Sequence, residues 1–218
     1  DYARVKQTWM NVIPDMKRNW DEFTKNEEQI KKDVMRTDRE EKMFAKDDSE
    51  NLKILSNVLM SSAMFNMRIG YGQGMNDIVS MLMRITKKES SLFWLFQSVM
   101  TILQGFYHTD AKYLYKLLNK LDPVVNSVAP ALSVYLKEKE INYVFTYKWI
   151  VLLFKRYFKD EDILRVWDAI FAYPSSKFYY FIVVAIIKEY SDDIIDNQME
   201  FEDVYQLFQS LGQIGRAS

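Results

Sequence analysis

The stretch LKILSNVLMSSAMF, residues 52–65, shows the spacing that decides the fold class. Apolar side chains recur in it every three or four positions, which is the period of an α-helix. The same spacing returns along most of the chain, and the apolar runs are not flanked by hairpin turn chemistry. We therefore predict an all-α, multi-helical domain with roughly ten to thirteen helices and no significant sheet. The helical face of the quoted stretch consists of Leu52, Leu55, Val58, Leu59, Ser62 and Phe65.

Composition narrows the classes of function. The 218 residues include only 6 glycines and 4 prolines, too few for a sandwich or barrel with many tight turns. Cysteine is absent and there is one histidine, which excludes disulfides, thiolate metal sites, cysteine nucleophiles and histidine-rich metal clusters. The net charge of -1 gives no general attraction for nucleic acid, so no nucleic-acid partner is expected.

The longest uncharged run covers residues 90–109, which is 20 residues. That length is enough to cross a bilayer. Its Gln, Ser and Thr side chains and the histidine favour a buried helix, and a membrane-spanning helix is the second interpretation. The chain starts at Asp1 without a signal-peptide pattern, so we expect a fragment of a longer, cytoplasmic protein with no transmembrane segment.

A candidate charge-stabilising residue closes the segment IKKDVMR, residues 30–36. On a helix, Asp33 and Arg36 are three positions apart, so the carboxylate can hold the guanidinium. A positioned arginine is the side chain that best stabilises charge on a phosphoryl group. Taken alone, an arginine in a charged segment is more often a solvated surface residue.

The glycines gather in the segment GYGQGM, residues 70–75, which holds half of those in the chain. Glycine allows positive φ angles and close approach of the backbone to a partner. Such a loop can direct Gln73 outward, and a glutamine amide can orient a water molecule because it both donates and accepts hydrogen bonds. The alternative is a flexible turn between helices. A phosphate-binding P-loop is excluded because no Gly-Lys-Ser or Gly-Lys-Thr follows.

Together these segments resemble a known family. The patterns Ile30-x-x-Asp33-x-x-Arg36 and Tyr71-x-Gln73 resemble the two finger motifs of the TBC domain, the helical module of GTPase-activating proteins that act on Rab GTPases. The blocks KDVMRTDR (32–39), GYGQGMND (70–77) and ILRVWD (163–168), with the segment around Trp149, follow the order of the family. The resemblance implies a TBC domain over residues 1–211, truncated at its N-terminus relative to the family, and a tail over 212–218 of the kind left by an expression vector.

The resemblance also implies a mechanism. The domain would act in trans on a Rab GTPase in its GTP form, as a GTPase activator in membrane trafficking and not as a nucleotide hydrolase itself. Arg36 would be an arginine finger that neutralises charge on the γ-phosphate, and Gln73 a glutamine finger that orients the attacking water. GTP and Mg²⁺ would be carried by the partner, and the chain would need no cofactor or metal of its own. It would work on the cytoplasmic side, peripheral to intracellular membranes, through that partner.

Supporting roles follow from the same resemblance. Ile30 would pack under the helix that carries Arg36, and Asp33 would orient Arg36 or contact the partner. Tyr71 would fix the turn or touch the GTPase, and Gly74 would permit close packing at the start of the next helix. By chemistry alone Arg39 competes for the finger role, but the motif spacing favours Arg36 and leaves Arg39 as a surface or partner contact. The supporting and partner-contact candidates are Ile30, Asp33, Thr37, Arg39, Tyr71 and Gly74.

A different class of function has the same fold. The chain could be a non-catalytic helical domain that binds a Rab or a scaffold without accelerating hydrolysis. The presence of both Arg36 and Gln73 argues against this alternative. A hydrolase with its own metal or nucleophile is a remote third interpretation, because the sequence offers neither metal ligands nor an activated nucleophile.

Overall fold

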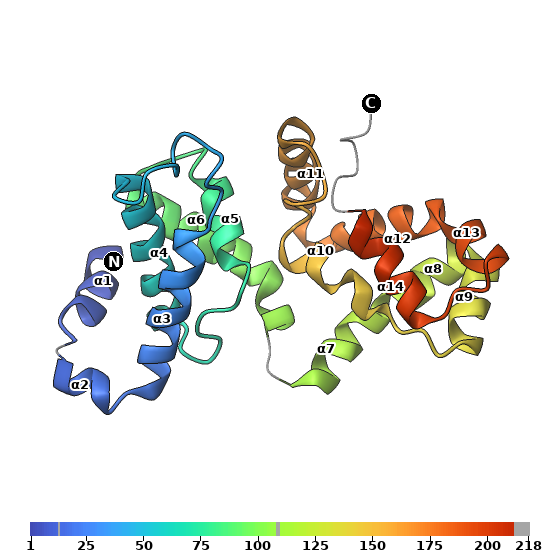
Figure 1. The fold of residues 1–218 in the computed structure, drawn as a ribbon, viewed down its shortest axis with the longest axis horizontal. Helices are drawn as coiled ribbons and strands as arrows, with labels where there is room; N and C mark the ends of the chain where they lie inside the picture. Colours follow the sequence, from blue (N-terminus) through green and yellow to red (C-terminus); the bar gives the residue numbers. More distant parts are fainter. Residues whose placement is uncertain (13, 108–109, 212–218) are drawn as a thin grey trace. The chain divides into compact units, whose positions relative to one another are not determined.

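The structure, a computed structural model, describes residues 1–12, 14–107 and 110–211, and these residues form helices and turns without a strand (Figure 1). The prediction of an all-α fold is confirmed. The chain divides into two compact units, residues 1–107 and 108–218. The expected domain limits of 1–211 stay a prediction, and the expected tail at 212–218 lies outside the described residues.

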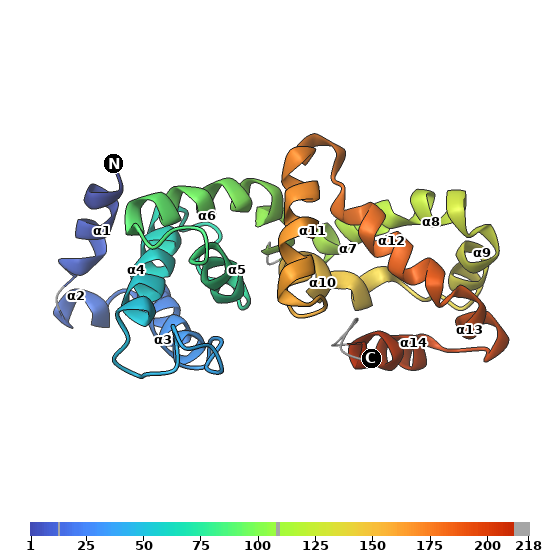
Figure 2. The same ribbon diagram turned by 90° about the horizontal axis from the view of Figure 1, so that it is seen from above.

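The N-terminal unit contains six α-helices and a short 3₁₀ helix in its described residues. They are α1 (Tyr2–Met10), α2 (Pro14–Arg18), α3 (Asp21–Met35), α4 (Glu50–Phe65), α5 (Met75–Leu82), α6 (Glu89–Leu103) and η1 (Gln104–Tyr107). Helix α4 is the centre of this unit, because α1, α3, α5 and α6 all pack against it (Figure 2). It begins at the N-cap Ser49, whose hydroxyl accepts a hydrogen bond from the Asn51 N–H at 3.2 Å. The predicted face of this helix is buried at Leu52, Leu55, Val58, Leu59 and Ser62, but Phe65, which was expected to belong to it, is half exposed near the end of the helix.

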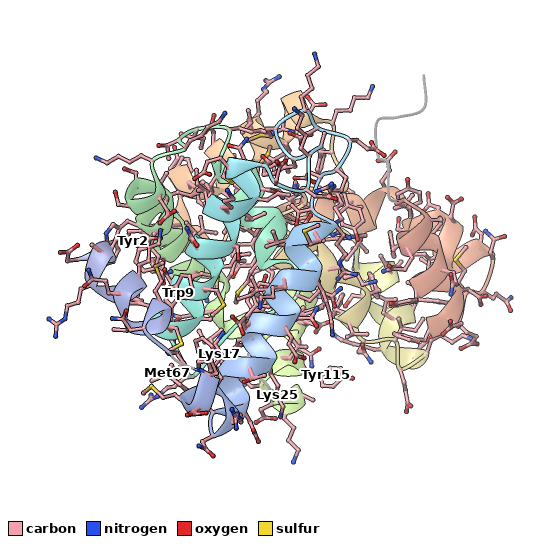
Figure 3. The ribbon with its side chains drawn as sticks, turned by 60° about the vertical axis from the view of Figure 1, so that its left-hand side comes forward. Tyr2, Trp9, Lys17, Lys25, Met67 and Tyr115 are labelled. Carbon is pink, nitrogen blue, oxygen red and sulfur yellow. The ribbon has the colours of Figure 1, made fainter. Side chains whose placement is uncertain are left out.

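Helix α1 is fastened to the rest of the unit by polar side chains (Tyr2 and Trp9 are labelled in Figure 3). The Trp9 indole N–H donates to Ser61 Oγ of α4 at 3.0 Å. The Tyr2 hydroxyl and the Lys6 ammonium both donate to Glu89 Oε1 of α6, each at 2.6 Å. These bonds place α1 against α4 and the start of α6.

Between α3 and α4 the chain makes a series of turns rather than a helix, over residues 36–49. Phe44, the main large apolar residue of this charged segment, is completely buried and anchors it to the unit. Asp38 has a left-handed backbone, with φ of 43°, and its carboxylate accepts a hydrogen bond from the Ser80 hydroxyl of α5 at 2.7 Å. The segment that follows Arg36 is therefore held against the body of the unit.

The described part of the C-terminal unit is also helical. Its elements are α7 (Ala111–Leu118), η2 (Asn119–Leu121), α8 (Asp122–Val128), α9 (Pro130–Glu138), η3 (Tyr143–Thr146), α10 (Tyr147–Val151), α11 (Asp160–Ala172), η4 (Pro174–Ser176), α12 (Tyr179–Glu189), α13 (Ser191–Asp196) and α14 (Phe201–Ser210). Pro130 is the first residue of α9 and separates it from α8, because proline is favoured at the first position of a helix. The core of this unit contains Trp149, whose ring meets Phe208 edge to face at 5.1 Å between centroids.

The apolar run 144–158 does not continue as one helix. Helix α10 ends at Val151, and Leu153 and Phe154 then adopt left-handed backbones with φ of 43° and 63° although both are completely buried. The indole N–H of Trp167 on α11 donates to the Leu153 carbonyl oxygen at 2.7 Å, which helps to stabilise this turn.

The uncharged run 90–109 falls mainly in α6. Its Leu92, Phe93 and Phe96 side chains are completely buried against neighbouring helices, as expected for a core helix. Within the described residues, no helix has the length and apolar character that crossing a membrane requires.

Candidate functional site

Arg36 lies at the C-terminal end of α3, where the helix gives way to turns. Acidic residues Asp21 and Glu22 in the first turn favour helix formation at the other end. The inner face of α3 is buried, and Ile30 on this face is completely inaccessible. The Arg36 side chain is 60% exposed, so its guanidinium extends from a fixed helix end into solvent.

The buried carboxylate of Asp33 holds this guanidinium. Arg36 Nη2 donates to Asp33 Oδ1 at 2.6 Å, and Gln29 Nε2 donates to the same oxygen at 3.0 Å. The second oxygen, Oδ2, accepts from the Tyr71 hydroxyl at 2.7 Å. Three donors therefore compensate a carboxylate whose side chain is fully buried, which is the condition for keeping a charge out of water.

The bond from Tyr71 joins the two sequence motifs directly. Burial raises the pKa of the Tyr71 phenol well above its usual value, and the hydrogen bond to the negatively charged Asp33 raises it further. The phenol is therefore protonated at every physiological pH and acts as a donor. One carboxylate thus binds Arg36 through one oxygen and, through the other, residues 70–76, which contain Gln73 and are called the glutamine segment below.

Asn76 completes a ring of hydrogen bonds between α3 and the glutamine segment. Its Nδ2 donates to Thr37 Oγ1 at 2.9 Å, and the Thr37 hydroxyl donates to the Asp33 carbonyl oxygen at 2.6 Å. Its Oδ1 accepts from the Gly74 N–H at 3.2 Å and lies 3.1 Å from the Tyr71 hydroxyl oxygen. Thr37 and Asn76 are both buried, so each depends on these bonds.

Gln73 occupies the corner of a tight turn. The Met75 N–H donates to the Gly72 carbonyl oxygen at 3.1 Å, which closes a four-residue turn. Gly74 has φ of 100° and ψ of -15°, near the values of about 80° and 0° that define the third residue of a type II turn. Gln73 is the second residue of this turn, its side chain is exposed, and no described residue hydrogen-bonds its amide.

The glutamine segment is also fixed where it begins. Gly70 has a left-handed φ of 62°, and the Tyr71 N–H donates to Asn26 Oδ1 of α3 at 2.9 Å. A β-carbon on Gly70 would lie 3.1 Å from that same oxygen, so glycine is favoured here by both backbone and space. The segment is thus bound to the middle of α3 by Asn26 and to its end by Asp33.

Arg39, the chemical competitor for the arginine role, is placed differently. Its guanidinium forms an ion pair with Asp47 and donates through Nη2 to the Ala45 carbonyl oxygen at 3.0 Å. Its side chain is 29% exposed, about half the value for Arg36. The structure therefore uses Arg39 to tie the 36–49 segment to itself.

The predicted site residues meet in one place, and three further ones join them. Ile30, Asp33, Arg36 and Thr37 lie at the end of α3, where the segment with Tyr71, Gln73 and Gly74 meets them. The sequence interpretation did not assign roles to Asn26, Gln29 or Asn76. The signal for Gln29 was its position four residues before Asp33 on a helix. Within the described residues, no group of three or more His, Cys, Asp or Glu side chains is arranged to bind a metal ion.

Comparison with known proteins identifies the family. The model of the Rab-GTPase-TBC domain matches residues 1–195, and the chain belongs to this family. TBC1 domain family member 16 of Homo sapiens is 30% identical over 216 residues, which cover 97% of this chain and 28% of that protein. The GTPase-activating protein GYP7 of Yarrowia lipolytica is 29% identical over 237 residues, covering 97% of this chain and 32% of that protein. The chain thus spans about a third or less of these two relatives.

Solved structures share the fold. The crystal structure of the Ypt/Rab-GAP domain of Gyp1p superimposes with a TM-score of 0.73 at 18% identity, covering 95% of this chain and 73% of that one. The Chlamydomonas flagellar RabGAP TBC domain gives a TM-score of 0.70 at 19% identity and covers 98% and 67% of the two chains. The predicted TBC fold is confirmed.

Proposed function

We propose that this chain accelerates GTP hydrolysis by a Rab GTPase in its GTP form, and that it supplies Arg36 and Gln73 in trans. Family membership supports the reaction class. The observation that carries the residue assignment is the Asp33 carboxylate, which binds Arg36 and Tyr71 at once. It brings the segments of two exposed side chains, a cation and an amide, to the same end of α3.

Arg36 has the chemistry to stabilise the transition state. Phosphoryl transfer develops negative charge on the phosphate oxygens, and catalysis consists mostly of positioning and electrostatic stabilisation. A guanidinium has five N–H donors, and Asp33 uses one of them. The remaining donors face solvent on a 60% exposed side chain, where a partner's phosphates can reach them.

Gln73 has the chemistry to orient the attacking water. Its amide carbonyl can accept a proton of that water while its NH₂ group donates to a neighbouring oxygen. The type II turn fixes the backbone at Gln73 but leaves the side chain exposed. In this proposal GTP and Mg²⁺ are bound by the partner, no cofactor is held by this chain, and membrane association comes through the Rab.

Single-turnover hydrolysis tests the proposal, with this chain in excess over a panel of purified GTP-loaded Rabs. Arg36→Ala is expected to lower the rate on the responsive Rab by about 10³-fold or more. Gln73→Ala is expected to lower it by about 10²-fold. Arg36→Lys keeps the charge but not the forked geometry, and it should fall between Arg36→Ala and the unaltered chain.

Matched controls come from the same unit. Arg18 is an exposed arginine paired three positions away with Asp15, at 3.0 Å, so Arg18→Ala removes a similar pair outside the site. Gln7→Ala removes an exposed glutamine from α1. Both controls should retain the full rate. Full activity in Arg36→Ala and Gln73→Ala would refute the residue assignment, and Rab binding without acceleration by the unaltered chain would establish the non-catalytic alternative.

A further inference from the structure

Gly72 differs from the other two glycines of its segment in the reason glycine is needed. Gly70 and Gly74 have left-handed backbones, with φ of 62° and 100°, and Gly72 does not. A β-carbon on Gly72 would instead lie 2.2 Å from Cδ1 and 2.6 Å from Cε1 of Tyr107. The three atoms nearest to that position all belong to the ring of Tyr107. The aromatic ring therefore fills the space that a side chain at residue 72 would take.

Tyr107 reaches this position from a well-anchored element. It is the last residue of η1, which follows α6 without a break, and its neighbour Phe106 is 2% exposed. Burial and Asp33 are the main causes of the raised pKa of Tyr71, and the Tyr107 phenol adds to them, so the two phenols are neighbours. The ring therefore lies beside residues 70–76 and belongs to an element that Phe106 anchors in the core.

Gly72 is the first residue of the turn that has Gln73 at its second position. Its carbonyl oxygen closes the turn by accepting from the Met75 N–H, and its own N–H lies 3.3 Å from Met75 Sδ as a donor. The Tyr107 ring, packed against the α-carbon of Gly72, therefore fixes the position of the first residue of the turn. The segment is fixed on either side of this residue, because the Tyr71 N–H donates to Asn26 Oδ1 and the Gly74 N–H donates to Asn76 Oδ1.

We propose that Tyr107 is a positioning residue for Gln73, acting through its ring against the α-carbon of Gly72. The inference rests on the proposed function for its effect on catalysis, because it deepens the role of the same site. The inference depends on complementary size: Gly72 has no side chain, and the Tyr107 ring occupies the space that a side chain would take. A displacement of about 1 Å at the base of the turn is enough to misplace a catalytic group and to cost up to about 10²-fold in rate.

The test is a swap of side-chain size in the full chain. Gly72→Ala adds the β-carbon that collides with the ring, Tyr107→Ala removes the ring, and the double variant does both. Tyr107→Phe keeps the ring and removes only the hydroxyl. Two quantities are measured for each: the maximal single-turnover rate with its half-saturating concentration, and the hydrogen-exchange rate of the Met75 amide, whose bond to Gly72 reports the closed turn.

Gly72→Ala should lower the maximal rate by about 10-fold or more, with little change in the half-saturating concentration, and should speed exchange at Met75. Tyr107→Ala should have the same kind of effect because the turn loses its support. The double variant should recover most of the loss caused by Gly72→Ala, in both quantities, because the added methyl group fills the space left by the ring. Tyr107→Phe should resemble the unaltered chain in Met75 exchange.

Two results would overturn the proposal. One is a double variant that is no better than Gly72→Ala, which would show independent effects. The other is an equal loss in Tyr107→Phe and Tyr107→Ala, which would assign the effect to the hydroxyl. If the unaltered chain activates no Rab, the proposed function fails, but the exchange rates still decide the contact: recovery in the double variant supports it and additivity overturns it.

Discussion

Arg36 and Gln73 are presented in opposite ways. Arg36 follows the end of a fifteen-residue helix, and its long side chain is held near its tip by one bond to Asp33 Oδ1. Gln73 has an amide that no described residue binds, but the backbone around it is fixed by Asn26, Asn76 and the turn that Gly72 closes. One group is positioned through its side chain and the other through its main chain.

The difference predicts which substitutions would displace each side chain. An arginine has four rotatable side-chain bonds, so a fixed backbone alone would leave its guanidinium widely dispersed. The bond to Asp33 limits the range of positions that the Arg36 guanidinium can take. In the proposed function the Gln73 amide turns toward a water and a second oxygen, which requires a mobile side chain on a fixed backbone. Substitutions at the two kinds of support should therefore have distinguishable effects.

The largest effect on stability is expected at Asp33, which binds both Arg36 and the glutamine segment. Asp33→Ala removes the acceptor of three donors, so the Gln29 amide loses its bond and the Tyr71 hydroxyl keeps only the longer contact with Asn76 Oδ1. Because unsatisfied buried donors are costly, we expect the free energy of unfolding to fall by about 3 kcal/mol. Urea unfolding measures this change.

Asp33→Asn sharpens the same experiment. An asparagine can still accept from Tyr71 through its oxygen, but its NH₂ group faces the donors of Arg36 and Gln29. It should therefore lower GTPase activation through Arg36 while retaining more stability than Asp33→Ala. Equal stability of the two variants would contradict the idea that the Tyr71 bond joins the segments.

Gly74→Ala disturbs the backbone of the turn that holds Gln73 and leaves the Arg36 side-chain contact in place. An L-residue other than glycine is strained at φ of 100°, so we expect a loss of about 1–2 kcal/mol in unfolding free energy. Arg36 keeps its bond to Asp33 in this variant, so any loss of GTPase activation should come through Gln73. Activity of the combined variant Gly74→Ala/Gln73→Ala should then equal that of Gln73→Ala, and a further drop would contradict the separation of the two supports.

Tyr71→Phe removes a single hydroxyl from the shared network. It deletes the donor to Asp33 Oδ2 and leaves the ring in place, so we expect a loss of about 1 kcal/mol, measured by thermal or urea unfolding. Asp33 retains Arg36 and Gln29 as donors. A loss as large as that of Asp33→Ala would mean that the tyrosine bond, and not the arginine pair, dominates the network.

The smallest effect on stability is expected at Glu89, which accepts hydrogen bonds from Tyr2 and Lys6 of α1. This contact lies outside both segments and serves as a reference. Burial acts to raise the pKa of Glu89, but hydrogen bonds from Asn57, Lys6 and Tyr2 outweigh it and lower the pKa below its usual 4.5. A lowered pKa in the folded state means that the contribution to stability is present above pH 4.5 and is lost as the pH falls.

The comparison with Glu89→Gln measures this contribution. The unaltered chain should be more stable than the variant near neutral pH by up to about 1 kcal/mol, the range of partly exposed ion pairs. The difference should shrink as the pH falls below about 4.5 in urea unfolding experiments. A difference that grows as the pH falls would contradict the sign of the pKa shift.

The sequence predicted those parts of the structure that depend on local spacing. Apolar periodicity gave the helical class and most of the buried face of α4. The pairing of Asp33 with Arg36 follows from a separation of three residues on one helix. In each case the deciding neighbours lie within one or two turns of each other.

What the sequence could not supply are the contacts between distant positions. Asn76 meets Thr37 across 39 residues, Tyr71 meets Asn26 across 45, and Tyr107 meets Gly72 across 35 positions of chain. Nothing in the local pattern distinguishes these polar residues from solvated ones. The non-glycine left-handed residues Leu153 and Phe154 were missed for the same reason, because their support comes from Trp167 on another helix.

The shared carboxylate has a consequence for protein design. A peptide carrying only the arginine motif would display a guanidinium but would lack the hydroxyl that occupies the second oxygen of Asp33. The smallest unit that could be transplanted to another scaffold is therefore discontinuous: residues 26–37, residues 70–76 and, in the inference above, the ring of Tyr107. A scaffold that reproduces the spacing of these three pieces would present the Arg36 and Gln73 side chains together, and one that reproduces a single piece would leave at least one of them without its support.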